Sequence, residues 1–205
     1  MDSQTRLVIK VLSTGIVIGF ILGKFVDIDI SIRRGAKSDK ISPTRAVVSR
    51  GKAKRGTLEL CYFENRSDMR KIEKSNTRIE RSNEQASEGR YSLKCFFPDG
   101  GGAIGFYETL PRNWEGYKTF TFDVYSEEED VPLSLFVKDR KNTAYYDRYN
   151  KEHIRLQKGW NSIEIPIEAI DRKLKLNDIN HVRLFLWKVP GEHTLYFDNI
   201  RLIGN

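Results

Sequence analysis

Few residues of this chain have the types and spacing that metal or nucleophilic chemistry requires. The sequence contains two cysteines, Cys61 and Cys95, and three histidines, His153, His181 and His193. The cysteines form no CxxC pair and the histidines are scattered, which excludes a zinc site with ordinary ligand spacing. Both cysteines fall in expected strands, in phase with core positions. They are either two buried free thiols or a disulfide across neighbouring strands.

Carboxylates are plentiful, but no pattern marks a catalytic pair. Hydrolysis of a glycosidic bond requires two carboxylates about 5–10 Å apart across a cleft. The sequence has no GxSxG, HExxH or phosphate-binding loop. Its run GGGAIG leads into another apparent strand and lacks a Lys-Ser/Thr ending, so we interpret it as a hairpin loop. We expect no enzymatic activity.

The C-terminal sequence TLYFDNIRLIGN contains a polar pair where a strand is expected. Asp198 and Asn199 separate two runs of apolar and β-branched residues. Acidic and amide side chains are depleted in strands because they compete for backbone hydrogen bonds. The pair is therefore a turn, a ligand of a structural ion, or part of a binding site.

The net charge of +7 is unevenly distributed over the 205 residues. Residues 1–55 hold 12 Lys and Arg against 4 Asp and Glu, whereas residues 56–205 hold 23 against 24. The second part is thus close to neutral, and a basic groove for nucleic acid is not expected there.

Residues 7–26, LVIKVLSTGIVIGFILGKFV, form a nearly continuous apolar run. Its length is about that needed to cross a bilayer as a helix. A cleaved signal peptide is the alternative, but no small-x-small cleavage site follows the run directly. We expect residues 1–30 to be an uncleaved, single-pass membrane anchor (a signal-anchor). Gly15, Gly19 and Gly23 would line one face of this helix and allow a partner transmembrane helix to approach closely.

Residues 31–56 are expected to form a flexible basic linker. Near an anionic membrane surface, each basic residue would contribute about 1 kcal/mol of attraction. More basic residues follow the apolar run than precede it, so the positive-inside rule places the C-terminal domain in the cytoplasm. We nevertheless expect the C-terminal domain to be extracytoplasmic, although the sequence leaves the orientation open.

Residues 57–205 contain short strand-like runs separated by turn signals such as PDGGG, EEEDVP and VPGE. The runs are 58–64, 77–81, 90–97, 103–110, 118–125, 133–139, 153–157, 161–167, 181–187 and 194–202. Strands at this spacing, without a convincing amphipathic helix, predict an all-β fold: an antiparallel jelly-roll β-sandwich.

The succession GRYSLK, NWEGYKTFTFDVY, VPLSLFVKD, KGWNSIEIPI, INHVRLFLW and HTLYFDNIRL resembles the galactose-binding-like β-sandwich. It is closest to domains of the carbohydrate-binding-module type that are attached to glycoside hydrolases and other envelope proteins. The resemblance covers roughly residues 58–203. Because this fold hosts sugar binders, protein binders and structural modules, the motifs specify the fold better than the function.

Alternation within the strands predicts which side chains are buried. The expected core residues are Phe120, Phe122, Val124, Leu133, Leu135, Val137, Ile154, Leu156, Val182, Leu184 and Leu186. Trp114 and Trp160 lie at turns, where we expect them to cap the ends of the core. The opposite face would carry Asp123, Tyr125, Phe136, Lys138, Arg155, Arg183, Phe185 and Trp187.

That outward face has four aromatic residues where a solvent-facing sheet should be mostly polar. In the modules that the chain resembles, aromatic rings on the concave sheet stack on sugar rings, and charged or amide groups bind the hydroxyls. A protein partner suits the same composition, and cover by the linker or by the loop 142–150 is a third interpretation. Tyr145 and Tyr146 of this loop would extend a binding rim, or close over the edge of the sandwich.

The resemblance also implies a structural calcium ion near the chain ends. The matching positions are Glu64, Glu88 with its loop, and Asp198. Calcium takes six to eight oxygen ligands, and these positions would supply part of that shell. The alternative for Asp198 is a turn in which its carboxylate accepts backbone N–H groups.

These observations lead to one functional expectation and one alternative. We expect a non-catalytic, membrane-anchored module that binds a cell-envelope or extracellular glycan. The alternative is an accessory or scaffold subunit of a membrane complex, whose sandwich binds protein.

Overall fold

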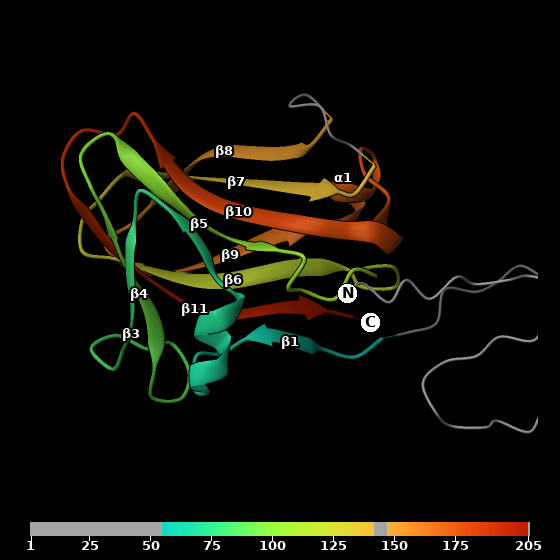
Figure 1. Ribbon diagram of the computed structural model, residues 1–205, viewed down its shortest axis with the longest axis horizontal. Helices are drawn as coiled ribbons and strands as arrows, with labels where there is room; N and C mark the ends of the chain where they lie inside the picture. The colour runs from blue at the N-terminus through green and yellow to red at the C-terminus, as the bar shows by residue number, and fades with distance from the viewer. Residues whose placement is uncertain (1–54, 142–146, 205) are drawn as a thin grey trace, which may run out of the picture. The chain divides into compact units, whose positions relative to one another are not determined.

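The computed structural model describes residues 55–141 and 147–204, which form a sandwich of two antiparallel sheets (Figure 1). The expected membrane anchor with Gly15, Gly19 and Gly23, and nearly all of the linker, lie outside the described residues. So do Tyr145 and Tyr146. Within the described ranges, no helix has the length and apolar character to cross a membrane.

The described elements follow the expected order of strands, with short helices between some of them. In chain order they are β1 (Leu58–Cys61), η1 (Arg66–Lys71), β2 (Glu73–Ser75), β3 (Arg78–Ser82), β4 (Ser92–Phe97), β5 (Gly101–Tyr107), β6 (Thr119–Ser126), β7 (Val131–Asp139), β8 (Tyr149–Leu156), β9 (Gly159–Pro166), α1 (Ile167–Asp171), η2 (Leu176–Asp178), β10 (Ile179–Trp187) and β11 (His193–Ile203). Each of the ten expected runs contains a strand, whereas β2 and the short helices were not expected.

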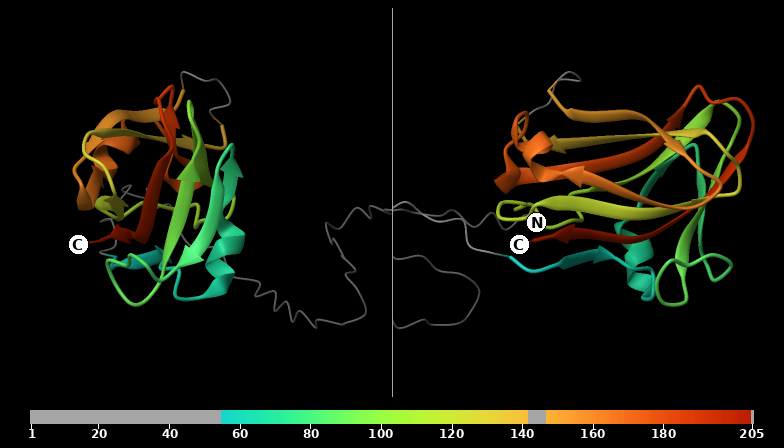
Figure 2. Two further views of the ribbon diagram at one scale, coloured as in Figure 1. Left: turned by 90° about the vertical axis from the view of Figure 1, so that its left-hand side faces the viewer. Right: turned by 180° about the vertical axis from the view of Figure 1, so that it is seen from behind.

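The strands form two sheets, which Figure 2 shows as separate layers. Sheet A has the order β3-β4-β11-β6-β9, and β1 pairs with the C-terminal part of β11. Sheet B has the order β2-β5-β10-β7-β8. From β5 to β11 the chain crosses between the sheets repeatedly, as in jelly-roll sandwiches. The expectation of an antiparallel β-sandwich is therefore confirmed.

The core lies between the two sheets, where the inward side chains of both meet. All the residues expected there are buried, except Ile154 on the edge strand β8, which is half-buried. Trp114 is fully buried, and its ring stacks on that of Phe120 with 5.2 Å between the ring centroids. Its indole N–H donates to the carbonyl of Pro111 at 2.9 Å. Trp114 closes one end of the core, as expected.

Trp160 does not cap the core, and this expectation was wrong. It is 37% exposed and lies on the outer face of sheet A, opposite Tyr125 in the register of β9 with β6. The two rings meet edge to face at 5.5 Å. Proximity to a turn suggested a cap, but Trp160 shares the outward phase of β9 with Ser162 and Glu164.

Cys61 and Cys95 are both buried free thiols and form no disulfide. They lie on β1 and β4, which both pair with β11 and not with each other. The alternative, a disulfide across neighbouring strands, was therefore wrong. Burial raises the pKa of Cys61 to about 12 and also raises that of Cys95. Both sulfur atoms therefore serve as small apolar groups of the core.

Replacing Trp114 with Ala should lower the free energy of unfolding by about 3–5 kcal/mol, because it leaves a large cavity at the end of the core. Trp160→Ala is the matched control, since it removes the same side chain from an exposed position. Denaturant unfolding of both variants measures the difference. Equal losses in the two variants would contradict the assignment of Trp114 to the core.

Candidate functional site

The outer face of sheet B places a strand of large side chains beside a strand that is almost bare. Four residues of β10 point outward and are called the β10 row: His181, Arg183, Phe185 and Trp187. Their partners in the register of β5 are, in the same order, Tyr107, Gly105, Ala103 and Gly101. Three of the four members of the row therefore lie beside a residue that has no side chain or only a methyl group.

The bare strand leaves a groove of about 710 Å³ on this face, which we call the sheet B groove. Ser75 and Asn76 at the end of β2 line one side of it. The other side comes from β7, β8 and the residue before β8: Pro132, Ser134, Phe136, Arg148, Glu152 and His153. A smaller hollow of about 320 Å³ adjoins it and shares Ser75, Ala103 and Arg183. The volume is in the range of small-molecule sites.

An irregularity in β8 accounts for two of the polar residues in the groove. The register of β7 with β8 shifts between Leu133 and Leu135, and His153 has a left-handed backbone with φ of 55°. Its N–H donates to the hydroxyl of Ser134 at 3.3 Å. Such bulges re-aim side chains, and here Glu152 and His153 both line the groove.

Three aromatic side chains line the groove, and the tryptophan among them is exposed. Trp187 is 69% exposed at the C-terminal end of β10, whereas Phe136 is nearly buried. Phe136 and Phe185 lie with ring centroids 6.1 Å apart, and the guanidinium of Arg148 lies 4.5 Å above the Phe136 ring. Phe136 is thus held between neighbours, while Trp187 offers its ring to solvent. Large exposed apolar side chains beside a groove indicate a binding surface.

His181, at the other end of the β10 row, lies in an aromatic setting. Its ring meets those of Tyr107 and Phe136 edge to face at 5.4 and 5.0 Å. Burial lowers the pKa of His181 to about 4, and the positive charges of Arg183 and Lys138 contribute to this shift. The imidazole is therefore neutral at neutral pH.

Of the eight predicted ligand-binding residues that the structure describes, four lie together and the other four lie elsewhere. Phe136, Arg183, Phe185 and Trp187 line one groove. Arg155 lies on the edge strand β8, where it pairs with Asp130 at 3.1 Å, and Lys138 lies opposite His181 near the end of β7. Neither of these two lines the groove.

Asp123 and Tyr125 were wrongly assigned to the same face. Both lie on β6 and point outward from sheet A, on the opposite side of the molecule from the β10 row. Period-2 alternation shows which side chains of a strand point outward, but it does not show to which sheet that strand belongs. The alternation of β6 and β10 is the same, so sequence alone merged the two outer faces.

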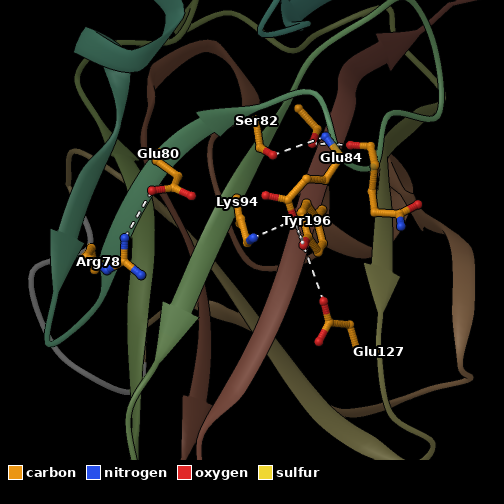
Figure 3. Close-up of polar contacts among 9 residues, drawn as sticks. Arg78, Glu80, Ser82, Glu84, Lys94, Glu127 and Tyr196 are labelled. Carbon is orange, nitrogen blue, oxygen red and sulfur yellow. Dashed lines mark hydrogen bonds and ion pairs between the residues drawn. The ribbon is translucent and has the colours of Figure 1, made fainter.

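The outer face of sheet A has a network of polar and charged contacts (Figure 3). The hydroxyl of Tyr196 donates to the carboxylate of Glu84 at 2.7 Å, and Lys94 binds the same carboxylate. This ion pair lowers the pKa of Glu84 and raises that of Lys94, while burial and the bond to Glu84 raise the pKa of Tyr196 to about 12. Because each charge has a partner, we interpret the cluster as structural.

Asp198 and Asn199 form a bulge in β11. The register with β6 shifts between Asp198 and Arg201, and Asn199 has a left-handed backbone with φ of 53°. The fully buried carboxylate of Asp198 accepts the N–H groups of Ser87 and Glu88 at 2.9 and 3.2 Å, and that of Asn199 at 2.7 Å. Burial raises the pKa of Asp198 although these donors act in the opposite direction. The pair thus attaches the 83–91 loop to the closing strand.

Glu64 binds the same loop through different groups. Its carboxylate accepts the N–H groups of Arg90 and Tyr91 at 2.6 and 2.8 Å, and these bonds lower its pKa. The side chain of Glu88 instead lies 3.8 Å from Arg201. Among the described residues, no group of three or more His, Cys, Asp or Glu has the geometry of a metal site. The carboxylates of Glu64 and Asp198 both accept backbone N–H groups, and the calcium ion stays a prediction.

Sequence reasoning missed the small residues that form the floor of the groove and of the adjoining hollow. The run GGGAIG was interpreted as a hairpin loop, but Gly101 already begins β5. The signal was present as Gly101, Ala103 and Gly105, three small residues at a spacing of two. Glycine within a strand often marks a place where a ligand or another backbone approaches closely. Arg148 and His153 carried no such signal, because a bulge and a loop place them.

Replacing His181 with Gln should flatten part of the pH dependence of stability. Between its ordinary pKa of 6.5 and its folded value of about 4, the unfolded chain binds a proton that the folded chain does not. The wild type should therefore lose stability as the pH falls through this range, by at most about 3 kcal/mol relative to the variant. Denaturant unfolding of the wild type and of His181→Gln at pH 7 and pH 4.5 measures the loss of stability in each protein. Parallel losses would show that His181 is not held neutral.

Comparison with known proteins identifies the fold. No protein-family model and no curated protein matches this sequence. The family 11 carbohydrate-binding module from Clostridium thermocellum, solved in complex with a β-1,3-1,4-mixed-linked tetrasaccharide, aligns with a TM-score of 0.57 and 14% identity over 73% of this chain and 96% of that chain. An exo-β-agarase aligns with a TM-score of 0.58 and 16% identity over 72% of this chain and 26% of that chain.

A solution structure of a family 11 module extends the same likeness. It aligns with a TM-score of 0.53 and 18% identity over 73% of this chain and 96% of that chain. At such identities the likeness concerns the fold alone. The described part of this chain has the β-sandwich fold of carbohydrate-binding modules.

Proposed function

We propose that this protein is a non-catalytic binding module that holds a glycan in the sheet B groove. The observation that carries the proposal is the exposed ring of Trp187 beside a strand emptied of side chains by Gly101, Ala103 and Gly105. The hollow gives a flat ligand access to the ring, which would be blocked by a large side chain on β5.

The composition of the groove suits a sugar. A pyranose ring has apolar C–H faces that stack on an aromatic ring, and a rim of hydroxyl groups that bind polar side chains. Trp187 and Phe185 provide aromatic surface, and Ser134, Asn76 and Glu152 provide donors and acceptors. Sites for small ligands combine apolar surface with a few polar groups in this way.

The comparisons support the proposal through the fold. The family 11 module was solved with a tetrasaccharide, so at least one sandwich of this type holds a glycan. A non-catalytic role is supported by the charges of the groove, since among the described residues Glu152 is the one carboxylate that lines it, whereas glycosidases use two.

The membrane anchor completes the proposed architecture. The apolar run of residues 7–26 would hold the module at a membrane, with the basic segment between them. The glycan would then be one of the cell envelope or of the surroundings, and the module would face outward. A protein ligand for the same groove is the alternative that the following experiment decides.

Replacing Trp187 with Ala should weaken polysaccharide binding by about thirtyfold, the loss typical of a tryptophan that anchors an interface. The full chain in mild detergent is tested by affinity electrophoresis and pull-down against mixed-linked β-glucan, agarose, polygalacturonate and a sulfated galactan. Trp160→Ala is the matched control, because it removes an exposed tryptophan from the other sheet. The proposal fails if no polysaccharide retains the protein, or if Trp187→Ala binds as the wild type does.

A further inference from the structure

Arg183 is the central charged residue of the sheet B groove. It is half-buried, and it lines both the groove and the smaller hollow beside it. On β5 its register partner is Gly105, and on β7 it is Phe136. One neighbour has no side chain and the other is an aromatic ring, so neither offers the guanidinium a hydrogen-bond acceptor.

The other arginines of the described strands all bind an acceptor. Arg78 pairs with Glu80 at 3.0 Å, and Arg155 pairs with Asp130 at 3.1 Å. Arg81 donates to the carbonyl oxygens of Phe63 and Glu64, and Arg201 lies 3.8 Å from a carboxylate oxygen of Glu88. Within the described part of the chain, the Arg183 guanidinium has no hydrogen bond and no ion pair. A guanidinium without an acceptor from the protein can bind one that a ligand supplies.

The surroundings of Arg183 add positive charge. The guanidinium of Arg148 lies over the Phe136 ring beside it. Lys138 and Arg183 both add to the effect of burial in lowering the pKa of His181, because their positive charges disfavour its protonated form.

The nearby carboxylates lie at the margins of the sheet. Glu73 is on the edge strand β2 and Glu152 on the edge strand β8. The side chain of Glu73 is 56% exposed, with a carboxylate oxygen 4.0 Å from the ring of His181, and Glu152 is exposed. Water screens such solvated charges, so they offset the central arginine only in part.

We propose that the sheet B groove recognises a glycan that carries an anionic group, a carboxylate or a sulfate, and that Arg183 binds this group. The inference rests on the proposed function and adds the chemical class of the ligand. The planar guanidinium forms two parallel hydrogen bonds to a carboxylate or a similar oxyanion. Trp187 and Phe185 stack on the sugar ring that bears the anion, and the anion supplies the partner that Arg183 does not have in the described chain.

Pairs of polymers that differ only in their charged groups distinguish the contribution of the anion to binding from that of the sugar. Polygalacturonate is compared with its methyl ester, which removes the carboxylate charge, and a sulfated galactan is compared with its desulfated form. Affinity electrophoresis and titration by tryptophan fluorescence give the Kd for the full chain in mild detergent. Preference within the first pair identifies a carboxylate as the anion, and preference within the second identifies a sulfate.

The wild type should bind at least one charged polymer about tenfold more tightly than its neutral counterpart, the difference expected for a charge-assisted pair. Arg183→Gln should lower this preference about tenfold relative to the wild type. Arg183→Lys, which keeps the charge but not the planar fork, should lower it less. Arg172→Gln is the matched control, because Arg172 follows α1 and pairs with Glu168. The basic N-terminal segment attracts polyanions equally in all variants, so the contribution of Arg183 is the change in preference between the wild type and Arg183→Gln.

Two kinds of result would overturn the inference. The first leaves the proposed glycan-binding function intact, and the second overturns that function too. If the wild type binds both members of each pair equally, or Arg183→Gln keeps the preference, the anionic class is wrong while a glycan-binding groove stands. If these four polymers, mixed-linked β-glucan and agarose all fail to bind, the proposed function is overturned as well. Thermal unfolding of Arg183→Gln shows that any loss of binding occurs in a folded protein.

Discussion

The antiparallel pairing of β5 with β10 is the constraint on which the proposed site depends. It places Gly101, Ala103 and Gly105 directly beside Trp187, Phe185 and Arg183. A shift of this register by one residue would turn the small residues inward and put Ile104 and Phe106 on the outer face. The same pairing also buries Leu184 and Leu186 against the core. Core packing therefore maintains the register that keeps the groove open.

The other sheet supplies the support for this arrangement. The long strand β11 pairs with β4, β6 and β1, and the bulge at Asp198 holds the loop that leads into β4. Glu64, in the segment that follows β1, holds the same loop. Buried aromatic residues of β6 and β11, with Phe122 and Phe197 at 6.5 Å, then pack beneath sheet B. Sheet A thus carries the charge network and the contacts that hold the 83–91 loop. Sheet B carries Trp187, the more exposed tryptophan, and Arg183, which has no hydrogen bond or ion pair within the described residues.

Much of the fold could be predicted from alternation, because each strand buries one face. The expected core residues are buried and the expected strands are present. The assignment of strands to sheets could not be predicted, since Asp123 and Phe185 have the same local pattern but lie on opposite faces. Trp160 was misassigned for a related reason: nearness to a turn does not show whether a side chain points inward. The short strand β2 has three exposed residues and no apolar periodicity, so nothing in its sequence indicates pairing.

Four residues of the site could be predicted, and its shape could not. Phe136, Arg183, Phe185 and Trp187 stand out because aromatic and charged side chains at outward positions are unusual. The hollow arises from what is missing on β5, and from the bulge at His153 that turns polar groups toward it. Absent side chains and irregular backbone leave weak patterns in a sequence. Both become visible only when the neighbouring strand and its register are known.

The three tryptophans allow one direct test of where a glycan binds, since each reports a different part of the described molecule. Trp114 is in the core, Trp160 is on the outer face of sheet A and Trp187 is in the sheet B groove. In NMR spectra of the full chain in detergent, the three indole N–H signals are followed during titration with oligosaccharides of polygalacturonate and of mixed-linked β-glucan. A glycan bound in the sheet B groove should shift the Trp187 signal in a saturable manner while those of Trp114 and Trp160 stay in place. A shift of the Trp160 signal without one at Trp187, or no shift of any signal, would contradict it.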